Sequence, residues 1–140
     1  MDLAFRMLSR RSRSEAEIAG VLKLRGASAS LVRRVLGRLR VLGYVDDRKL
    51  AAECAERWKE RGFGSLRIQD QLRKLEVEER ITESVRPDSR EEREIARRVL
   101  ARTFDPGELA DRRVQARAAR FLAGRGFPAE VIDSLFDVWE

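Results

Sequence analysis

Apolar side chains recur along this chain with a helical spacing and again with a longer period of fifty residues. At that offset, five positions are apolar in three successive segments: Ile18, Ile68 and Ala118; Leu22, Leu72 and Leu122; Ala27, Val77 and Phe127; Leu31, Ile81 and Val131; Val35, Val85 and Leu135. Gly26 and Gly126 also coincide, with Glu76 between them breaking the rule. A fixed period of this length indicates one helical unit used several times, each burying its apolar face against a neighbour.

This pattern predicts an all-α fold made of three tandem three-helix repeats, helix-turn-helix-like in their connections. Their expected ranges are 1–45, 46–87 and 88–140. Period-two alternation typical of strands is absent, and aromatic residues make up only 6% of the chain. We expect an elongated array that offers an extended surface rather than a pocket.

Capping signals divide the repeats into helices. Ser14 and Glu17 form a capping box, Gly26 falls where a helix ends with positive φ, and Ser28 or Ser30 can cap the next helix. That third helix carries a wide apolar stripe, which comprises Leu31, Val32, Val35, Leu36, Leu39 and Leu42.

The later repeats carry similar signals. Asp46 and Asp47 precede a helix and are expected to cap it rather than to bind a metal. Ser89 and Glu92 are predicted to form a capping box at the start of the third repeat, in which an insertion lies around Pro106. Pro128 is expected at the first position of the last helix, and Trp139 is expected to pack against the end of that repeat.

The net charge of +6 is concentrated at one end of the sequence. Residues 1–45 contain ten basic and three acidic residues, which is +7, while the remaining twenty basic and twenty-one acidic residues give −1. Such a field attracts nucleic-acid phosphates. The candidate anion-binding residues here are Arg10, Arg11, Arg13, Arg33, Arg34, Arg38 and Arg40. Because no acid lies between Leu31 and Leu42, we favour binding over a merely solvated helix face.

A second candidate stripe lies in the third repeat. Arg113, Arg117 and Arg120 are spaced by four and three residues, which places them on one helix face. Asp111 and other nearby acids could neutralise this stripe, so a solvated face is an equal alternative.

The residues needed for most enzyme chemistry are missing. The chain has no histidine, no glycine-rich phosphate loop, no paired-cysteine metal spacing and no serine elbow. Its one cysteine, Cys54, is expected to be a small buried residue rather than a nucleophile. We therefore expect no catalytic, cofactor-binding or metal-binding residues, and a protein that is not an enzyme. With no signal peptide or membrane-spanning stretch apparent, we expect a cytoplasmic monomer.

Three segments stand out: RRSRSEAEI at 10–18 followed by Leu22 and Gly26, GYVDDRKLA at 43–51, and RFLAGRGFPAEVI at 120–132. In these segments the chain resembles the RecX-type regulatory proteins, bacterial modulators of the RecA recombinase. A fourth, RGFGSLRIQDQLRKLEV at 61–77, has Leu75 and Glu76 where the family usually has a basic residue and glycine. The order of the segments and the three repeats carry the resemblance.

The resemblance implies a curved array of three three-helix repeats that lies in the groove of the RecA–DNA filament. Such a protein would destabilise the filament or block its extension, and would inhibit strand exchange, ATP hydrolysis and stimulation of repressor self-cleavage. The expected partners are the RecA filament and single- or double-stranded DNA, and no membrane.

Two other functions fit parts of the sequence. A helix-turn-helix DNA-binding protein would use residues 30–42 as its recognition helix, with Arg33, Arg34 and Arg38 at phosphates or guanines. A tetratricopeptide-like scaffold is the third class, but its period and its Trp, Gly and Tyr positions do not match.

Overall fold

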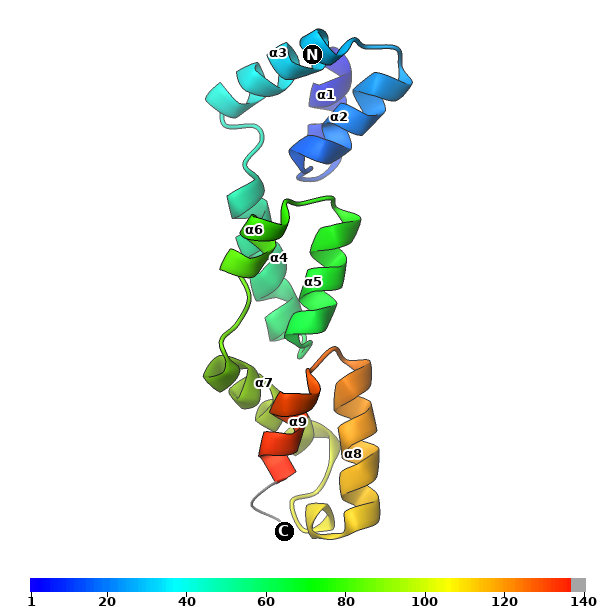
Figure 1. Ribbon diagram of the computed structural model, residues 1–140, viewed down its shortest axis with the longest axis vertical. Helices are drawn as coiled ribbons and strands as arrows, with labels where there is room; N and C mark the ends of the chain where they lie inside the picture. Colours follow the sequence, from blue (N-terminus) through cyan, green and yellow to red (C-terminus); the bar gives the residue numbers. More distant parts are fainter. Residues whose placement is uncertain (137–140) are drawn as a thin grey trace. The chain divides into compact units, whose positions relative to one another are not determined.

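The computed structural model describes residues 1–136, whose regular secondary structure is entirely helical, without a strand. The α-helices are α1 (Asp2–Arg10), α2 (Glu15–Leu24), α3 (Ala29–Val41), α4 (Asp47–Glu60), α5 (Ser65–Lys74), α6 (Glu79–Ser84), α7 (Ser89–Thr103), α8 (Arg112–Gly124) and α9 (Ala129–Phe136), with a short 3₁₀ helix, η1 (Glu108–Ala110), before α8 (Figure 1). The predictions of an all-α fold and of repeated three-helix units are confirmed. Trp139 lies outside the described residues.

The chain forms two compact units, and each draws on the middle repeat. The first comprises Met1–Glu53 and Gln71–Ser84, and the second comprises Cys54–Asp70 together with the chain from Val85 onward. The boundary therefore falls within α4 and within α5.

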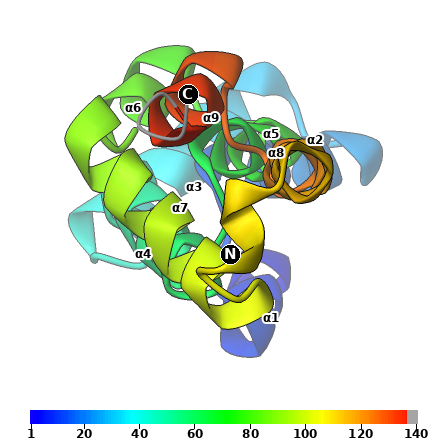
Figure 2. The same cartoon turned by 90° about the horizontal axis from the view of Figure 1, so that it is seen from below.

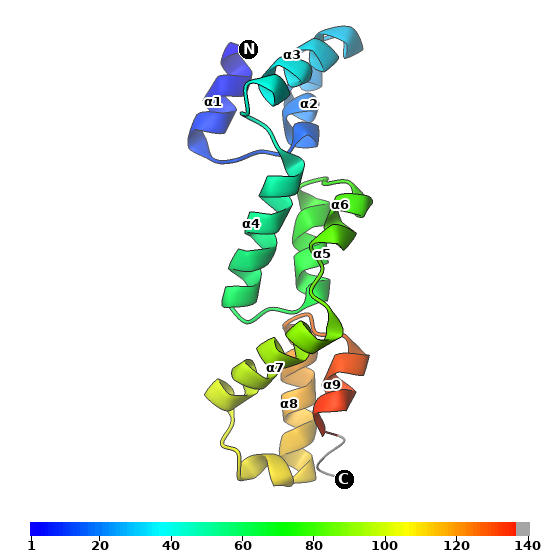
Figure 3. The same ribbon diagram turned by 90° about the vertical axis from the view of Figure 1, so that its left-hand side faces the viewer.

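In the first unit, α2 packs against both α1 and α3 (Figures 1 and 3). Their buried side chains meet in one cluster, which comprises Ala4, Ile18, Leu22, Val32, Val35, Leu39 and Val45. The predicted apolar stripe of α3 is too wide at its ends, because Leu31 is 41% and Leu42 51% exposed.

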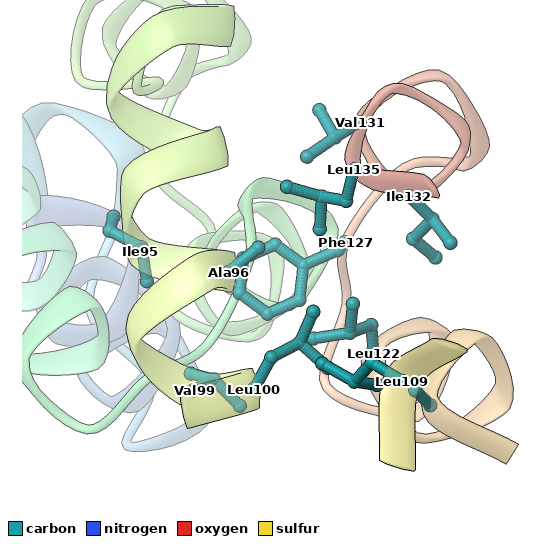
Figure 4. Packing of buried hydrophobic residues seen from close by; sticks show 11 residues of the cluster. Ile95, Ala96, Val99, Leu100, Leu109, Leu122, Phe127, Val131, Ile132 and Leu135 are labelled. Carbon is teal, nitrogen blue, oxygen red and sulfur yellow. The ribbon is translucent and has the colours of Figure 1, made fainter. Parts of the chain in front are cut away.

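In the second unit, α9 packs against α7 and α8, and η1 packs against α8. Figure 2 looks nearly along α8, with the segment that contains η1 joining α7 to its first turn. Phe127 is only 2% exposed, and its ring lies among Ala96, Leu122 and Leu135 from three different helices (Figure 4). The predicted insertion is thus confirmed, and Leu109 of η1 is buried in the same cluster.

The turn after the second helix has the same geometry in all three repeats. Gly26, Glu76 and Gly126 have φ angles of 90°, 58° and 88°, respectively. In each case the next residue donates its N–H to a carbonyl five residues earlier, as Val77 does to Leu72. Glu76 therefore adopts the conformation for which glycine is preferred, so the replacement of glycine has not changed the turn.

Several helix starts agree with the sequence and two do not. Ser14 and Glu17 form the predicted capping box, and Ser28 rather than Ser30 caps α3. The predicted capping box of Ser89 and Glu92 is wrong, because Asp88 caps α7 by accepting from Glu91 N–H. Helix α9 begins one residue later than predicted, after Pro128, whose carbonyl accepts from the first turn.

Candidate functional site

The seven candidate arginines of the first repeat form two groups in the structure. Arg11, Arg13 and Arg40 are held by carboxylates, whereas Arg10, Arg33, Arg34 and Arg38 are exposed and make no ion pair within the described residues. The charges of the second group are not offset by a carboxylate within the described residues.

The paired arginines support the start of α2. Arg11 lies 2.7 Å from a carboxylate oxygen of Glu17, and Arg13 lies 3.8 Å from the same oxygen. Burial opposes the ionisation of Glu17, but hydrogen bonds from Arg11 and from the Ser14 N–H outweigh it and lower the pKa of Glu17. These charges therefore stabilise the capping box.

Arg40 of α3 is paired with Glu15, which lies on α2 together with Glu17. Its Nη2 and Nε atoms donate to the two carboxylate oxygens of Glu15, which raises the pKa of Arg40. Since a bidentate pair holds the guanidinium in place, Arg40 is less free to bind an external anion than its neighbours on α3.

Arg33, Arg34 and Arg38 are the accessible cations of α3. They project from the helix away from Val32, Val35 and Leu39, which are buried. In the last turn of α3, Val41 is 88% exposed beside them, and Leu24 at the end of α2 is 87% exposed. The surface of α3 thus presents guanidinium groups without an ion pair in the described residues next to the exposed Val41 side chain.

The second candidate stripe is also exposed. Arg113, Arg117 and Arg120 lie on α8 and make no ion pair in the described part of the chain. Asp111, which could have neutralised them, instead accepts the backbone N–H of Arg113 at 2.8 Å as the cap of α8. Asp111 forms no ion pair with these three arginines.

A third cluster was missed by the sequence analysis. Arg61, Arg67 and Arg125 have their guanidinium carbons 5.4, 4.8 and 4.3 Å from the ring centroid of Phe63. Arg61 also lies 4.5 Å from the ring of Trp58. The signal was present as Arg-Gly-Phe, which occurs at 61–63 and again at 125–127, but these positions do not follow the fifty-residue period.

Backbone contacts between two turns bring this cluster together. Gly64 N–H donates to the Arg125 carbonyl and Leu66 N–H to the Gly126 carbonyl, each at 2.9 Å. A Cβ on Gly64 would stand 2.4 Å from the Gly126 oxygen, closer than any side chain allows. Glycine at 64 is therefore required for the two turns to meet.

The side chains of Arg125 and Arg67 reinforce the same contact. Arg125 donates from Nε to the Gly62 carbonyl and from Nη2 to the Arg61 carbonyl, at 3.0 and 2.6 Å. Arg67 donates to the Gly124 carbonyl at 2.9 Å. The two guanidinium groups are thus held in fixed orientations beside Phe63.

Groups with metal-binding or nucleophilic chemistry are not assembled in the described residues. Among these residues, no group of three or more histidine, cysteine or acidic side chains is placed so that it could hold a metal ion. Cys54 is buried, and burial raises the pKa of its thiol, which disfavours the reactive thiolate. None of the described helices is long and apolar enough to cross a membrane.

The N-terminal and C-terminal parts of the chain each match a domain family of RecX. Residues 1–39 match the family described as RecX, first three-helix domain, and residues 91–136 match RecX, third three-helix domain. The protein called Regulatory protein RecX in Halorhodospira halophila is 36% identical over 132 residues, which cover 94% of this chain and 82% of that protein. Its namesake in Thermus thermophilus is 37% identical over 128 residues, which cover 91% and 83%.

Solved structures agree with these matches at the level of the fold. The crystal structure of RecX from Lactobacillus salivarius superposes with a TM-score of 0.84 and 19% identity, covering 99% of this chain and 92% of that one. Another, described as regulatory protein RecX, has a TM-score of 0.74 and 22% identity, covering 95% and 69%. Given relatives above 30% identity along most of its length, this chain belongs to the RecX family of regulatory proteins.

Proposed function

We propose that this protein binds the RecA–DNA nucleoprotein filament and inhibits its activities: strand exchange, ATP hydrolysis and stimulation of repressor self-cleavage. It would thereby regulate homologous recombination, DNA repair and the SOS response in the cytoplasm. It would act as a monomer, and by binding rather than by catalysis. The observation that carries the proposal is membership of the RecX family along nearly the whole chain, combined with unpaired arginines on α3.

The distribution of charge supports a division of labour among the repeats. In this proposal, residues 1–45, which carry +7, engage the anionic groups of the filament. Residues 46–87 and 88–140 supply most of the protein contacts, since their basic and acidic residues nearly balance. Complementary charge of this kind favours fast association and correct orientation.

The deciding experiment is the DNA-stimulated ATPase of the cognate RecA, measured while this protein is titrated in. We expect loss of ATPase activity at amounts of this protein well below those of the recombinase. A filament whose ATPase is unchanged over that range would refute the proposal.

A DNA-binding protein without recombinase contact is the second candidate. It is favoured by the exposed arginines of α3, which follows α2 across the Gly26 turn as a recognition helix would. That function predicts tight, sequence-selective binding to naked duplex. Mobility shifts with unrelated competitor DNA separate the two candidates, because the filament proposal requires no such selectivity.

A further inference from the structure

The cluster around Phe63 concentrates positive charge in a small volume. Three guanidinium carbons, those of Arg61, Arg67 and Arg125, all lie within 5.4 Å of one ring centroid. In the described residues, none of the three forms an ion pair with a carboxylate. The faces of Phe63 and Trp58 offset part of this charge through cation–π attraction, but they supply no counter-charge. Like charges held this close favour the binding of an anion.

The three arginines retain most of their hydrogen-bonding capacity. A guanidinium has five N–H donors, of which Arg125 uses two on carbonyls and Arg67 uses one. The Arg61 side chain donates no hydrogen bond to any described residue and is exposed. Free donors therefore remain on all three side chains.

The cluster is also preorganised. Carbonyl contacts hold Arg67 and Arg125, and the rings of Trp58 and Phe63 hold Arg61, so little side-chain entropy would be lost on binding. The planar fork of arginine matches the oxygens of a phosphate better than lysine does. Guanidinium groups interleaved with aromatic rings are typical of surfaces that bind nucleic acids.

We infer that Arg61, Arg67 and Arg125, gathered around Phe63, form a binding site for the phosphodiester backbone of a nucleic acid. The site lies outside the basic first repeat, so it goes beyond the proposed function. It also operates without recombinase, because its chemistry requires only phosphate oxygens. Single-stranded and duplex nucleic acid are the two sources of that group.

Trp58 provides a local probe of this site. The chain has two tryptophans, so Trp139→Phe leaves Trp58 as the sole emitter beside Arg61. A dT15 oligonucleotide and a 15-base-pair duplex are titrated separately into this variant without recombinase, and Trp58 emission is followed at several salt concentrations. We expect at least one of them to quench or shift Trp58 emission in a saturable way. The nucleic acid that does so at the lower concentration is the preferred source of the phosphate groups.

Arg61→Gln tests the role of the site in the same background. Removing one arginine–phosphate interaction should reduce the salt slope for a single strand by about 0.7 and the affinity about fivefold at 0.1 M salt. Arg61→Lys, which keeps the charge, should restore most of the salt slope. Since the Arg61 side chain is exposed and makes no hydrogen bond, far-UV circular dichroism should be unchanged in both variants.

The matched control is Arg102→Gln, which removes one exposed charge near the end of α7 and no member of the cluster. A selective decrease in affinity for Arg61→Gln supports the site. Equal decreases in affinity for Arg61→Gln and Arg102→Gln would show that only net charge matters and would overturn the proposed site. A salt slope unchanged by Arg61→Gln would also overturn it, and so would Trp58 emission that neither nucleic acid changes. RecA inhibition is not measured, so failure here leaves the proposed function standing, and the reverse also holds.

Discussion

The Oδ1 atom of Asp47 accepts a hydrogen bond from the backbone N–H of Glu15, 3.0 Å away, so a carboxylate on α4 caps the first turn of α2. The same relationship recurs later in the chain, where Glu92 Oε1 on α7 accepts from Ser65 N–H on α5 at 2.7 Å. In both cases the first helix of one repeat satisfies an N–H at the start of the second helix of the preceding repeat.

A second contact repeats along with the first. The Ser14 hydroxyl donates to the Leu75 carbonyl at 2.5 Å, and Gly64 N–H donates to the Arg125 carbonyl. Fifty residues separate Ser14 from Gly64 and Leu75 from Arg125. Each junction between repeats thus joins the start of one second helix to the end of the next, although serine uses its side chain where glycine uses its backbone.

Replacing Asp47 tests the charge at the first of these junctions. Burial raises the pKa of Asp47, and so do the negative charges of the nearby Glu15 and Asp46 carboxylates. The hydrogen bond from the Glu15 N–H lowers this pKa, but the net shift is upward. The pKa of Asp47 is higher in the folded protein than in the unfolded chain. Its protonated form therefore contributes its whole stabilisation at a pH below the unfolded pKa, and this stabilisation is lost as the pH rises through the folded pKa. Ionised Asp47 therefore weakens the fold at neutral pH.

Asp47→Asn keeps an acceptor oxygen and removes the charge. In urea unfolding at pH 7, the free energy of unfolding should rise by about 0.5 kcal/mol, a small value because this half-buried group is screened by solvent. The gain should vanish as the pH falls and Asp47 becomes protonated. Asp47→Ala, which removes the acceptor, should cost about 1 kcal/mol. Equal destabilisation by Asn and Ala would contradict this account.

The sequence predicted the capping of Asp46 but only part of the role of Asp47. Asp46 accepts from Lys49 N–H three residues later, a local contact that residue spacing can predict. Asp47 was also expected to accept a backbone N–H, yet its donor belongs to another helix, thirty-two residues away. Local capping preferences contain no information about such a distant partner.

The error at Glu92 has the same origin. Ser89 and Glu92 have the spacing of a capping box, but Asp88 is an equally good cap one residue earlier. Glu92 is 2% exposed and is turned toward Ser65. The fifty-residue period of apolar positions predicted the repeats, whereas the contacts that join them depend on how two successive repeats approach each other.

Glu92 gives a second stability prediction. Glu92→Ala would leave the Ser65 N–H without a partner in a buried setting, at a cost of about 2 kcal/mol. Glu92→Gln retains an acceptor and should cost much less. Ser65→Ala is a useful control, because it keeps the N–H and removes a buried hydroxyl that has no hydrogen-bond partner in the described structure. This control should be neutral or slightly stabilising in the same urea titration.

Gly64 and Gly126 give a third prediction, for the contact between their two turns. Alanine at 64 would place its Cβ 2.4 Å from the Gly126 oxygen, and alanine at 126 would place it 2.6 Å from Arg67 N, at a φ of +88°. Each substitution should lower the free energy of unfolding by about 3 kcal/mol. Gly124→Ala, at the end of α8 with nothing within 4 Å of its Cβ, should be neutral or stabilising. A similar destabilisation at all three positions would exclude steric contact as the cause.

The final prediction concerns the arginines of the first repeat and their contribution to filament binding. Arg33, Arg34 and Arg38 are unpaired, so replacing all three by alanine should weaken binding to the RecA–DNA filament. The dependence of log K on log salt should flatten by roughly one unit for each phosphate that the variant no longer neutralises. Thermal unfolding should hardly change, because these side chains are exposed and touch no acid in the described residues.

Arg40→Ala serves as the contrast on the same helix. Arg40 is bonded to Glu15, so its replacement should change filament binding less than the replacement of any one unpaired arginine. Filament affinity is measured by fluorescence anisotropy of labelled protein at three or more salt concentrations. An unchanged salt slope in the triple variant would show that α3 presents only a solvated face. An equal effect of Arg40→Ala would show that net charge, rather than the unpaired arginines, governs binding.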